Sequence, residues 1–245
     1  MIETFTALAF THVLADFVFQ SKAMAEGKGQ RNRAGLGYLA AHGAIVAALS
    51  ALVLAGANWW PVAALALAHL ATDFAKGFAP RSLFAFLADQ AVHFAMIVAL
   101  SAAFPGLWAQ SLWAGQGWLP GTMALLAGLV VTTRAGGFAV GLLMVPYAEA
   151  IPPEGLPRGG QMIGLLERGL IFLLVLAGEP GGIGFLIAAK SILRFEAVQP
   201  GGANPKSEYV IIGTLASFGW ALAAGYATLA LMRALPGLGI LPPAP

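Results

Sequence analysis

The chain contains no cysteine and few charged residues. With no cysteine among 245 residues, disulfides, thiolate metal ligands and thiol catalysis are excluded. Charged residues make up 10% of the chain, whereas a soluble domain usually carries about 25%. The net charge of +2 is spread over short polar stretches and forms no single basic patch. This pattern argues against a nucleic-acid-binding protein.

Long apolar segments dominate the sequence. Hydrophobic residues account for 59% of the chain, the mean hydropathy is +0.80, and several apolar runs exceed the roughly 18 residues that suggest a membrane span. We therefore predict an all-α fold, a polytopic transmembrane bundle forming a single integral membrane domain over 1–245. About eight membrane helices are expected, the seventh of them short. Their approximate ranges are 3–20, 35–57, 62–78, 83–104, 119–147, 160–177, 183–195 and 208–235.

The loops between these predicted helices differ sharply in charge. The loops after helices one, three, five and seven contain Lys or Arg, and the loops after helices two, four and six contain neither. By the positive-inside rule, the basic loops are expected in the cytoplasm and both termini on the non-cytoplasmic side, as in an inner-membrane-type protein. On this interpretation Lys28, in the first basic loop, marks topology. The start Met-Ile-Glu lacks a basic n-region, so the first helix is predicted to be retained.

Every histidine of the chain falls in the first four predicted helices, which we treat as a half of their own (1–104). Three helices carry a histidine and an aspartate four residues apart, so that both lie on one helix face. The order His–Asp in helices one and three inverts to Asp–His in helix four, which runs the opposite way. The three carboxylates should therefore form one layer, with the histidines roughly 6 Å deeper. The seven residues are His12, Asp16, His42, His69, Asp73, Asp89 and His93.

Buried carboxylates in a membrane normally imply a partner or a function, and a cation would use the imidazoles as well. We therefore predict that these seven residues hold one or two divalent metal ions. Mixed nitrogen and oxygen ligands suit Zn, Mn, Fe or Ni, and zinc is favoured among them. A proton relay and a purely structural polar core are the alternatives.

The second half of the chain, 119–235, contains a separate charged set. Glu167 and Arg168 lie in predicted helix six, and Lys190 and Arg194 lie four residues apart in helix seven. Lys190 and Arg194 could hold an anionic group beside the metal, with Glu167 in the same site. The alternative is a structural ion pair that joins Glu167 to Arg168 or Lys190.

Several motifs together resemble one bacterial membrane family, called domain of unknown function 3307. They are His12-Val-Leu-Ala-Asp16-Phe-x-x-Gln20, His69-Leu-x-x-Asp73-x-x-Lys76 and Asp89-Gln90-x-x-His93, followed by Glu167-Arg168, Lys190-Ser191-x-x-Arg194 and Glu208-Tyr209. The resemblance extends over nearly the whole chain. Its helix-borne His/Asp pattern is also similar in style to putative membrane-bound metal-dependent hydrolases.

We therefore expect a metal-dependent hydrolase that acts on a phosphoester or lipid-linked substrate at the cytoplasmic membrane face. Asp73 or Asp89 would be the general base, and Lys190, Arg194 and Lys76 would stabilise anionic charge. Membrane lipids are the expected partners, and a homo-oligomer is compatible with the sequence. The alternatives are a metal-ion or proton transporter and a membrane scaffold with a structural metal. The gathering of ionisable groups at one side disfavours a transport pathway.

Overall fold

The computed structural model describes residues 1–30, 32–148, 156–195 and 205–239, with the side chains of 192–195 excepted. Within these residues every regular element is a helix, and two compact units can be distinguished. The first unit comprises Met1–Val130 with Leu231–Leu238, and the second comprises Val131–Ala230 with Gly239–Pro245.

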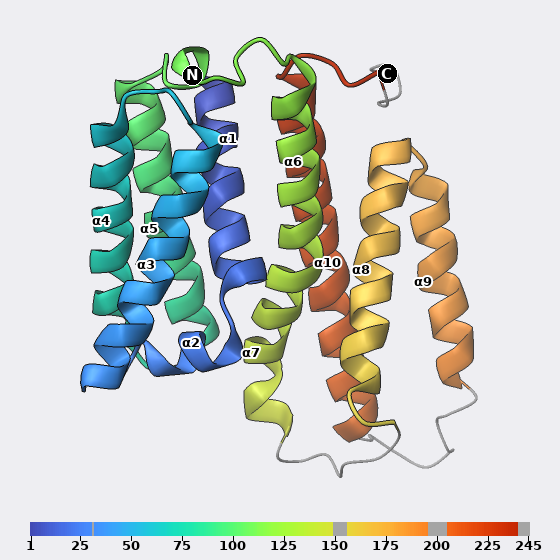
Figure 1. Ribbon diagram of the computed structural model, residues 1–245. Helices are drawn as coiled ribbons and strands as arrows, with labels where there is room; N and C mark the ends of the chain where they lie inside the picture. Colours follow the sequence, from blue (N-terminus) through green and yellow to red (C-terminus); the bar gives the residue numbers. More distant parts are fainter. Residues whose placement is uncertain (31, 149–155, 196–204, 240–245) are drawn as a thin grey trace. The chain divides into compact units, whose positions relative to one another are not determined.

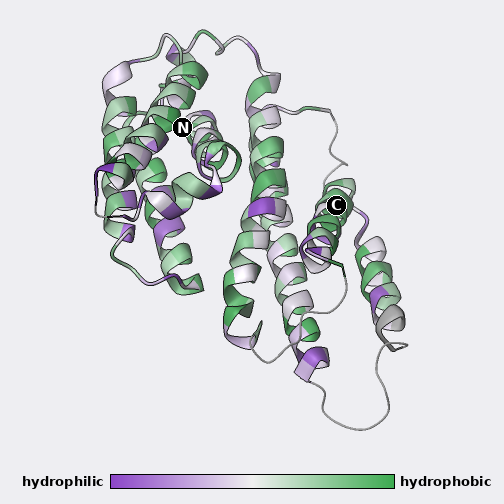
Figure 2. Ribbon diagram, turned by 60° about the horizontal axis from the view of Figure 1, so that its bottom comes forward, coloured by the Kyte–Doolittle hydropathy of each residue, from purple (hydrophilic) through white to green (hydrophobic). Residues whose placement is uncertain are grey.

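Six helical segments in the described part of the chain are long and apolar enough to cross a membrane. In Figure 2 hydrophobic residues, in green, make up much of the helices, and hydrophilic residues, in purple, are few. Two of the eight predicted spans, α4 (Trp59–Lys76) and α9 (Pro180–Phe195), are not among the six. α9 has 16 residues, fewer than the roughly 20 needed for a full crossing. The six segments are Ile2–Phe19, Arg33–Val53, Leu83–Ala103, Trp118–Ala148, Gly159–Ala177 and Pro205–Arg233.

The first unit is built on four helices that pack against one another (Figure 1). These are α1 (Ile2–Leu14), α3 (Arg33–Val53), α4 (Trp59–Lys76) and α5 (Leu83–Ala103), and α6 (Trp118–Val130) packs on α1. Their apolar core lies near one end of the helices, around Leu8, Ile97 and Trp108. The short helix α2 (Lys22–Gly27) forms where the sequence predicted only a loop, because the Ser21 hydroxyl caps it by accepting from the backbone N–H of Met24.

The two described ends of this unit lie near the α5–α6 connection. The amino group of Met1 donates to the carbonyl of Pro105, just beyond α5, and Leu238 packs over Gly121 at the start of α6. Met1 and Leu238 therefore lie at the same end of the unit. The prediction that this end faces the non-cytoplasmic side of the membrane stays a prediction.

The second unit consists of the π-helical turn η3 (Val131–Ala135), α7 (Gly136–Ala148), α8 (Gly159–Ala177), α9 (Pro180–Phe195) and most of α10 (Pro205–Arg233). Its core is a separate apolar cluster around Ile171, Phe218 and Ala221.

Candidate metal centre

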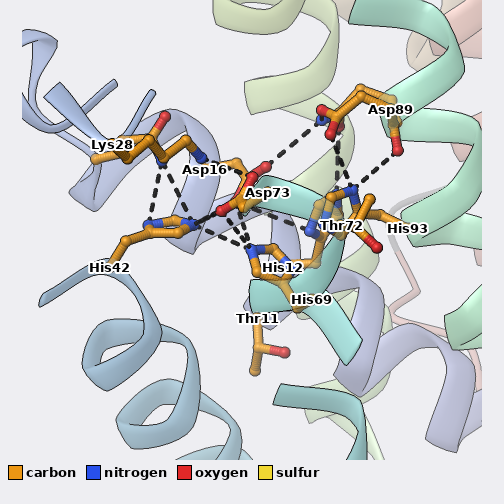
Figure 3. A network of polar contacts seen from close by, with 12 residues as sticks. Thr11, His12, Asp16, Lys28, His42, His69, Thr72, Asp73, Asp89 and His93 are labelled. Carbon is orange, nitrogen blue, oxygen red and sulfur yellow. Dashed lines mark hydrogen bonds and ion pairs between the residues drawn. The ribbon is translucent and has the colours of Figure 1, made fainter. Parts of the chain in front are cut away.

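All seven residues predicted as metal ligands meet inside the first unit. Figure 3 shows the carboxylates of Asp16 and Asp73 between His42 on one side and His93 on the other. α1, α3, α4 and α5 each contribute at least one histidine, and their side chains are at most 4% exposed. The predicted layers of carboxylates and imidazoles are therefore in direct contact.

The local structure of the first helix changes to a π turn at the site. Residues Ala15–Phe19 form the π turn η1, which widens the end of α1 and includes Asp16. His12 still lies one turn before Asp16, with Nδ1 and Oδ1 3.9 Å apart. The wider turn contributes a carboxylate to the bundle interior just before the chain leaves the helix at Gln20.

Four atoms from three helical segments form the centre of the cluster. His42 Nε2 lies 3.0 Å from His69 Nε2, 3.3 Å from Asp16 Oδ1 and 3.2 Å from Asp73 Oδ2. His69 Nε2 lies 3.5 Å from Asp16 Oδ1 and 3.6 Å from Asp73 Oδ2. A tetrahedral ion with metal–ligand distances of about 2.0–2.1 Å separates its ligands by about 3.3–3.4 Å. The five distances thus fit the edges of one tetrahedron.

Of these five contacts, the one between His42 Nε2 and His69 Nε2 is a hydrogen bond, in which one imidazole donates to the other. Asp16 Oδ1 and Asp73 Oδ2 are buried and accept no hydrogen bond, although imidazole nitrogens lie within 3.2–3.6 Å of each. A buried carboxylate oxygen without a donor is costly, and a cation at the common centre would satisfy both oxygens and both nitrogens. The donor set therefore fits a divalent metal.

Two lysines supply the positive charge at this site. Lys28 Nζ lies 2.7 Å from Asp73 Oδ1 with its side chain only 9% exposed, and Lys76 Nζ lies 2.5 Å from Asp89 Oδ2 with 32% exposed. If the four imidazoles are neutral, three carboxylates and two ammonium groups leave one uncompensated negative charge. A bound cation would compensate that charge, and so would a single imidazolium.

Lys28 reaches Asp73 because the segment 21–30 passes close to the ends of α3 and α4. A Cβ at Gly35 would overlap the carbonyl oxygen of Gln30, and a Cβ at Gly27 would overlap the ring of Tyr38. Glycines at these two positions let the segment approach α3 without a clash.

Two glutamines orient the histidines and carboxylates. Gln90 accepts from His12 Nε2 at 3.2 Å through Oε1 and donates to Asp89 Oδ2 at 3.1 Å and Asp16 Oδ2 at 3.4 Å. His12 Nδ1 is then the unprotonated nitrogen, and it is buried without a partner. The amide nitrogen of Gln20 lies 3.2 Å from His42 Nδ1. If the amide were turned to present its oxygen, it would accept the Nδ1 proton and leave Nε2 free for a metal.

A small cavity adjoins three of the histidines. It has a volume of about 10 Å³, close to the space that one water molecule needs. Its wall includes His12, His69 and His93 together with Thr11 and Met96. The cluster is therefore nearly closed, with room for about one water beside the imidazoles.

The charged residues of the second half form their own cluster within the second unit. Lys190 Nζ contacts both carboxylate oxygens of Glu167, at 2.5 and 2.6 Å. Arg168 donates twice to the carbonyl of Thr133, at 3.1 and 2.9 Å, and once to the hydroxyl of Ser217. Arg194 falls in the last turn of α9, where side chains lie outside the described residues. That this cluster adjoins the His/Asp cluster stays a prediction.

Three side chains of the first unit were not assigned to the site from sequence. Lys28 was interpreted as a topology marker, and Gln20 and Gln90 were noted only as motif letters. Gln90 directly follows Asp89 and lies three residues before His93, a placement that could have suggested a role beside the ligands. Nothing in the spacing of Lys28 indicates Asp73, because the contact depends on the path of residues 21–30.

One comparison with known proteins gives a match. The model of a family described as "Protein of unknown function (DUF3307)" matches residues 4–115, which include all seven His and Asp residues and both lysines that pair with them. The match is narrower than the whole-chain resemblance, because the stretches around Glu167, Lys190 and Glu208 lie outside it. No curated protein and no solved structure matches the chain.

Proposed function

We propose that the segment 4–115, which belongs to the DUF3307 family of unknown function, forms a divalent-metal site in a membrane and uses it to hydrolyse a phosphoester. The observation that carries the proposal is the tetrahedral set of ligand atoms from Asp16, His42, His69 and Asp73. Zinc is the ion we favour, because it combines tetrahedral geometry with mixed imidazole and carboxylate ligands. Bound there, such an ion would need to expand from four to five ligands in order to polarise a phosphoryl oxygen or acidify a water.

The proton acceptor we assign is His12. Asp73 was expected as the base, but its Oδ2 belongs to the ligand set and its Oδ1 lies against Lys28. Asp89 was the other candidate, but its Oδ2 is held by Lys76 and Gln90 and the residue does not line the water-sized cavity. His12 Nδ1 is unprotonated in the tautomer that Gln90 imposes, lacks a partner, and belongs to a residue that lines the water-sized cavity.

The two lysines favour an anionic substrate. Lys28 and Lys76 both contact carboxylates of the cluster, and Lys76 is the more exposed of the two. Ammonium groups at this position would attract a phosphate, so they favour an anionic substrate. We infer that the substrate approaches past Lys76, from the polar face that the basic loops assign to the cytoplasm. A lipid-linked phosphate would then reach the site from a bacterial inner membrane.

A structural metal in a membrane scaffold is the second candidate. A centre with four protein ligands and little free volume is typical of structural ions, whereas catalytic ions keep an open position. The two candidates differ in what the metal does once it is bound, so they can be separated by experiment.

The test uses full-length protein in detergent, loaded with zinc and analysed by mass spectrometry. We expect at least one ion per chain in the wild type, and its loss in His42→Ala and Asp73→Asn. Thr72→Val is the matched control, because Thr72 precedes Asp73 but its hydroxyl donates to the Ala68 carbonyl and to the Met96 sulfur, neither of which belongs to the ligand set. Hydrolysis of para-nitrophenyl phosphate and of phosphatidic acid in mixed micelles should require the ion.

The outcomes separate the proposals. Metal that stabilises the protein without any phosphate release would favour the scaffold. A wild type that holds no metal after loading would defeat both proposals and leave a proton relay or a structural polar core.

A further inference from the structure

We propose that a second metal ion binds beside the first, held by Asp73, Asp89 and His93. This inference rests on the proposed function, because it concerns the same cluster and adds a second ion to it. One ligand atom from each of the three residues lies within 4.8 Å of the other two, and all three residues are buried. None of them except Asp73 belongs to the tetrahedral set described above.

His93 has a nitrogen that is oriented and free to bind a metal. Its Nδ1 donates to the carbonyl oxygen of Asp89 at 2.9 Å, one turn earlier in α5. That bond fixes the proton on Nδ1 and leaves the lone pair on Nε2, which is the usual arrangement of a metal-binding imidazole. Nε2 is buried and has no partner, and the residue is only 1% exposed.

Asp89 likewise has one oxygen that is held and one that is free. Its Oδ2 receives Lys76 Nζ at 2.5 Å and the Gln90 amide at 3.1 Å. Its Oδ1 is buried and accepts no hydrogen bond. This oxygen lies 3.6 Å from Nδ1 of the His93 ring. Lys76 and Gln90 thus fix the carboxylate and leave Oδ1 available for a cation.

Asp73 links the two ligand groups. It belongs both to the group with His42 and His69 and to the group with Asp89 and His93. The rings of His69 and His93 have their centroids 4.2 Å apart, so the two groups are in contact. A carboxylate shared between neighbouring ions is the geometry of two-metal sites, whose ions lie about 3.5–4 Å apart.

The second group differs from the first in the number of its protein ligands. Four residues surround the first position and would saturate a tetrahedral ion, whereas three residues surround the second and would leave one position open. The open position is the one at which water or a phosphoryl oxygen can bind. Two divalent ions would also turn the small negative charge of the cluster into a positive one, which favours a phosphate monoester over an uncharged ester.

The experiment loads full-length protein with Mn²⁺ and combines metal analysis with electron paramagnetic resonance. We expect two ions per chain in the wild type and a spectrum broadened by coupling between neighbouring Mn²⁺ ions. His93→Gln and the isosteric Asp89→Asn should each reduce the content from two ions to one and give an uncoupled spectrum. Met96→Leu is the control, since Met96 lines the same cavity and offers no comparable ligand.

The results distinguish failure of this inference from failure of the metal site itself. A wild type with one uncoupled ion, retained in His93→Gln and lost in His42→Ala, overturns the second site and leaves the first intact. A wild type without metal overturns both. Size-exclusion chromatography and circular dichroism check that each variant is folded, and the wild-type stoichiometry decides even if one variant is not.

Discussion

The two units of the chain each bury a cluster of charged side chains, and the clusters differ in whether their charges are satisfied. In the second unit, both oxygens of Glu167 contact Lys190, and Arg168 donates three hydrogen bonds to Thr133 and Ser217. In the first unit, buried oxygens of Asp16 and Asp89 and nitrogens of His12 and His93 have no hydrogen-bond partner.

Satisfied charges are typical of a structural cluster, as in the second unit, whereas unpartnered polar atoms are typical of a binding site, as in the first. The π turn η3 opens the backbone ladder near Thr133, and Arg168 fills the gap by donating to the carbonyl that is released. Glycines at 137 and 164 leave room for its guanidinium, because a Cβ at either would lie within 3 Å of a guanidinium nitrogen, and Gly136 leaves room for Trp220 and the Arg168 stem. In the described part of the first unit the completion is partial, because Lys28 and Lys76 each pair with one carboxylate while the atoms named above keep no hydrogen-bond partner.

The largest expected effect is stabilisation of the first unit by metal. At a free zinc concentration about 1,000 times the dissociation constant, the unfolding free energy should rise by about 4 kcal/mol. We expect chelation to reverse this gain, and His69→Ala to abolish it together with the bound ion. Thermal unfolding of the detergent-solubilised protein, with zinc and with chelator, measures the effect. If zinc stabilised the wild type and His69→Ala equally, the cluster of the first unit would not be the site that binds the metal.

The second prediction concerns the ion pair of the second unit. Glu167→Leu leaves the ammonium of Lys190 without its carboxylate, which should lower the unfolding free energy by about 3 kcal/mol. Because no metal is involved, zinc should not change this loss, and the double variant Glu167→Leu/Lys190→Met should recover most of it. Denaturant titrations of the three proteins provide the measurement. A Glu167→Leu loss that zinc restores would assign this cluster to metal binding as well.

The smallest expected effect tests how the first unit obtains its counter-ion Lys28. Gly35→Ala places a Cβ against the Gln30 carbonyl, so we expect a loss of about 1–2 kcal/mol and a weaker hold on Lys28. Gly37→Ala, two residues later in the same helix, meets nothing within 4 Å and should stabilise the protein by up to about 1 kcal/mol. Thermal unfolding of the two variants provides the measurement. Equal changes in their melting temperatures would show that the close approach of segment 21–30 to α3 does not depend on Gly35.

Much of the first unit could be predicted from sequence because its information is local. Apolar length defines the helices, and the four-residue spacing of His69 and Asp73 places both on one face of α4. The inverted order of Asp89 and His93 indicated that antiparallel helices bring like groups to one level. All seven predicted residues indeed meet in one network.

The contacts that sequence reasoning missed depend on the path of the backbone between helices. Lys28 is distant from Asp73 along the chain, and only the close approach permitted by Gly35 and Gly27 brings them together. A basic loop residue is more often a topology marker, so the charge of Lys28 alone favoured that interpretation. The role of Gln90 could have been inferred from its place between Asp89 and His93, but an amide has no charge to draw attention to it.

Because of the π turn at the end of α1, the geometry of the site depends on the number of residues in this stretch and not only on their identity. Such a turn accommodates one residue more than an α-helical turn, and each residue of a helix advances the chain by about 100°. Deleting a single residue from Ala15–Phe19 would restore a regular helix and rotate everything that follows it. Gln20 would then turn away from His42, and the segment carrying Lys28 would leave α1 in another direction. This short stretch should therefore tolerate substitution of its apolar side chains far better than a change in its length.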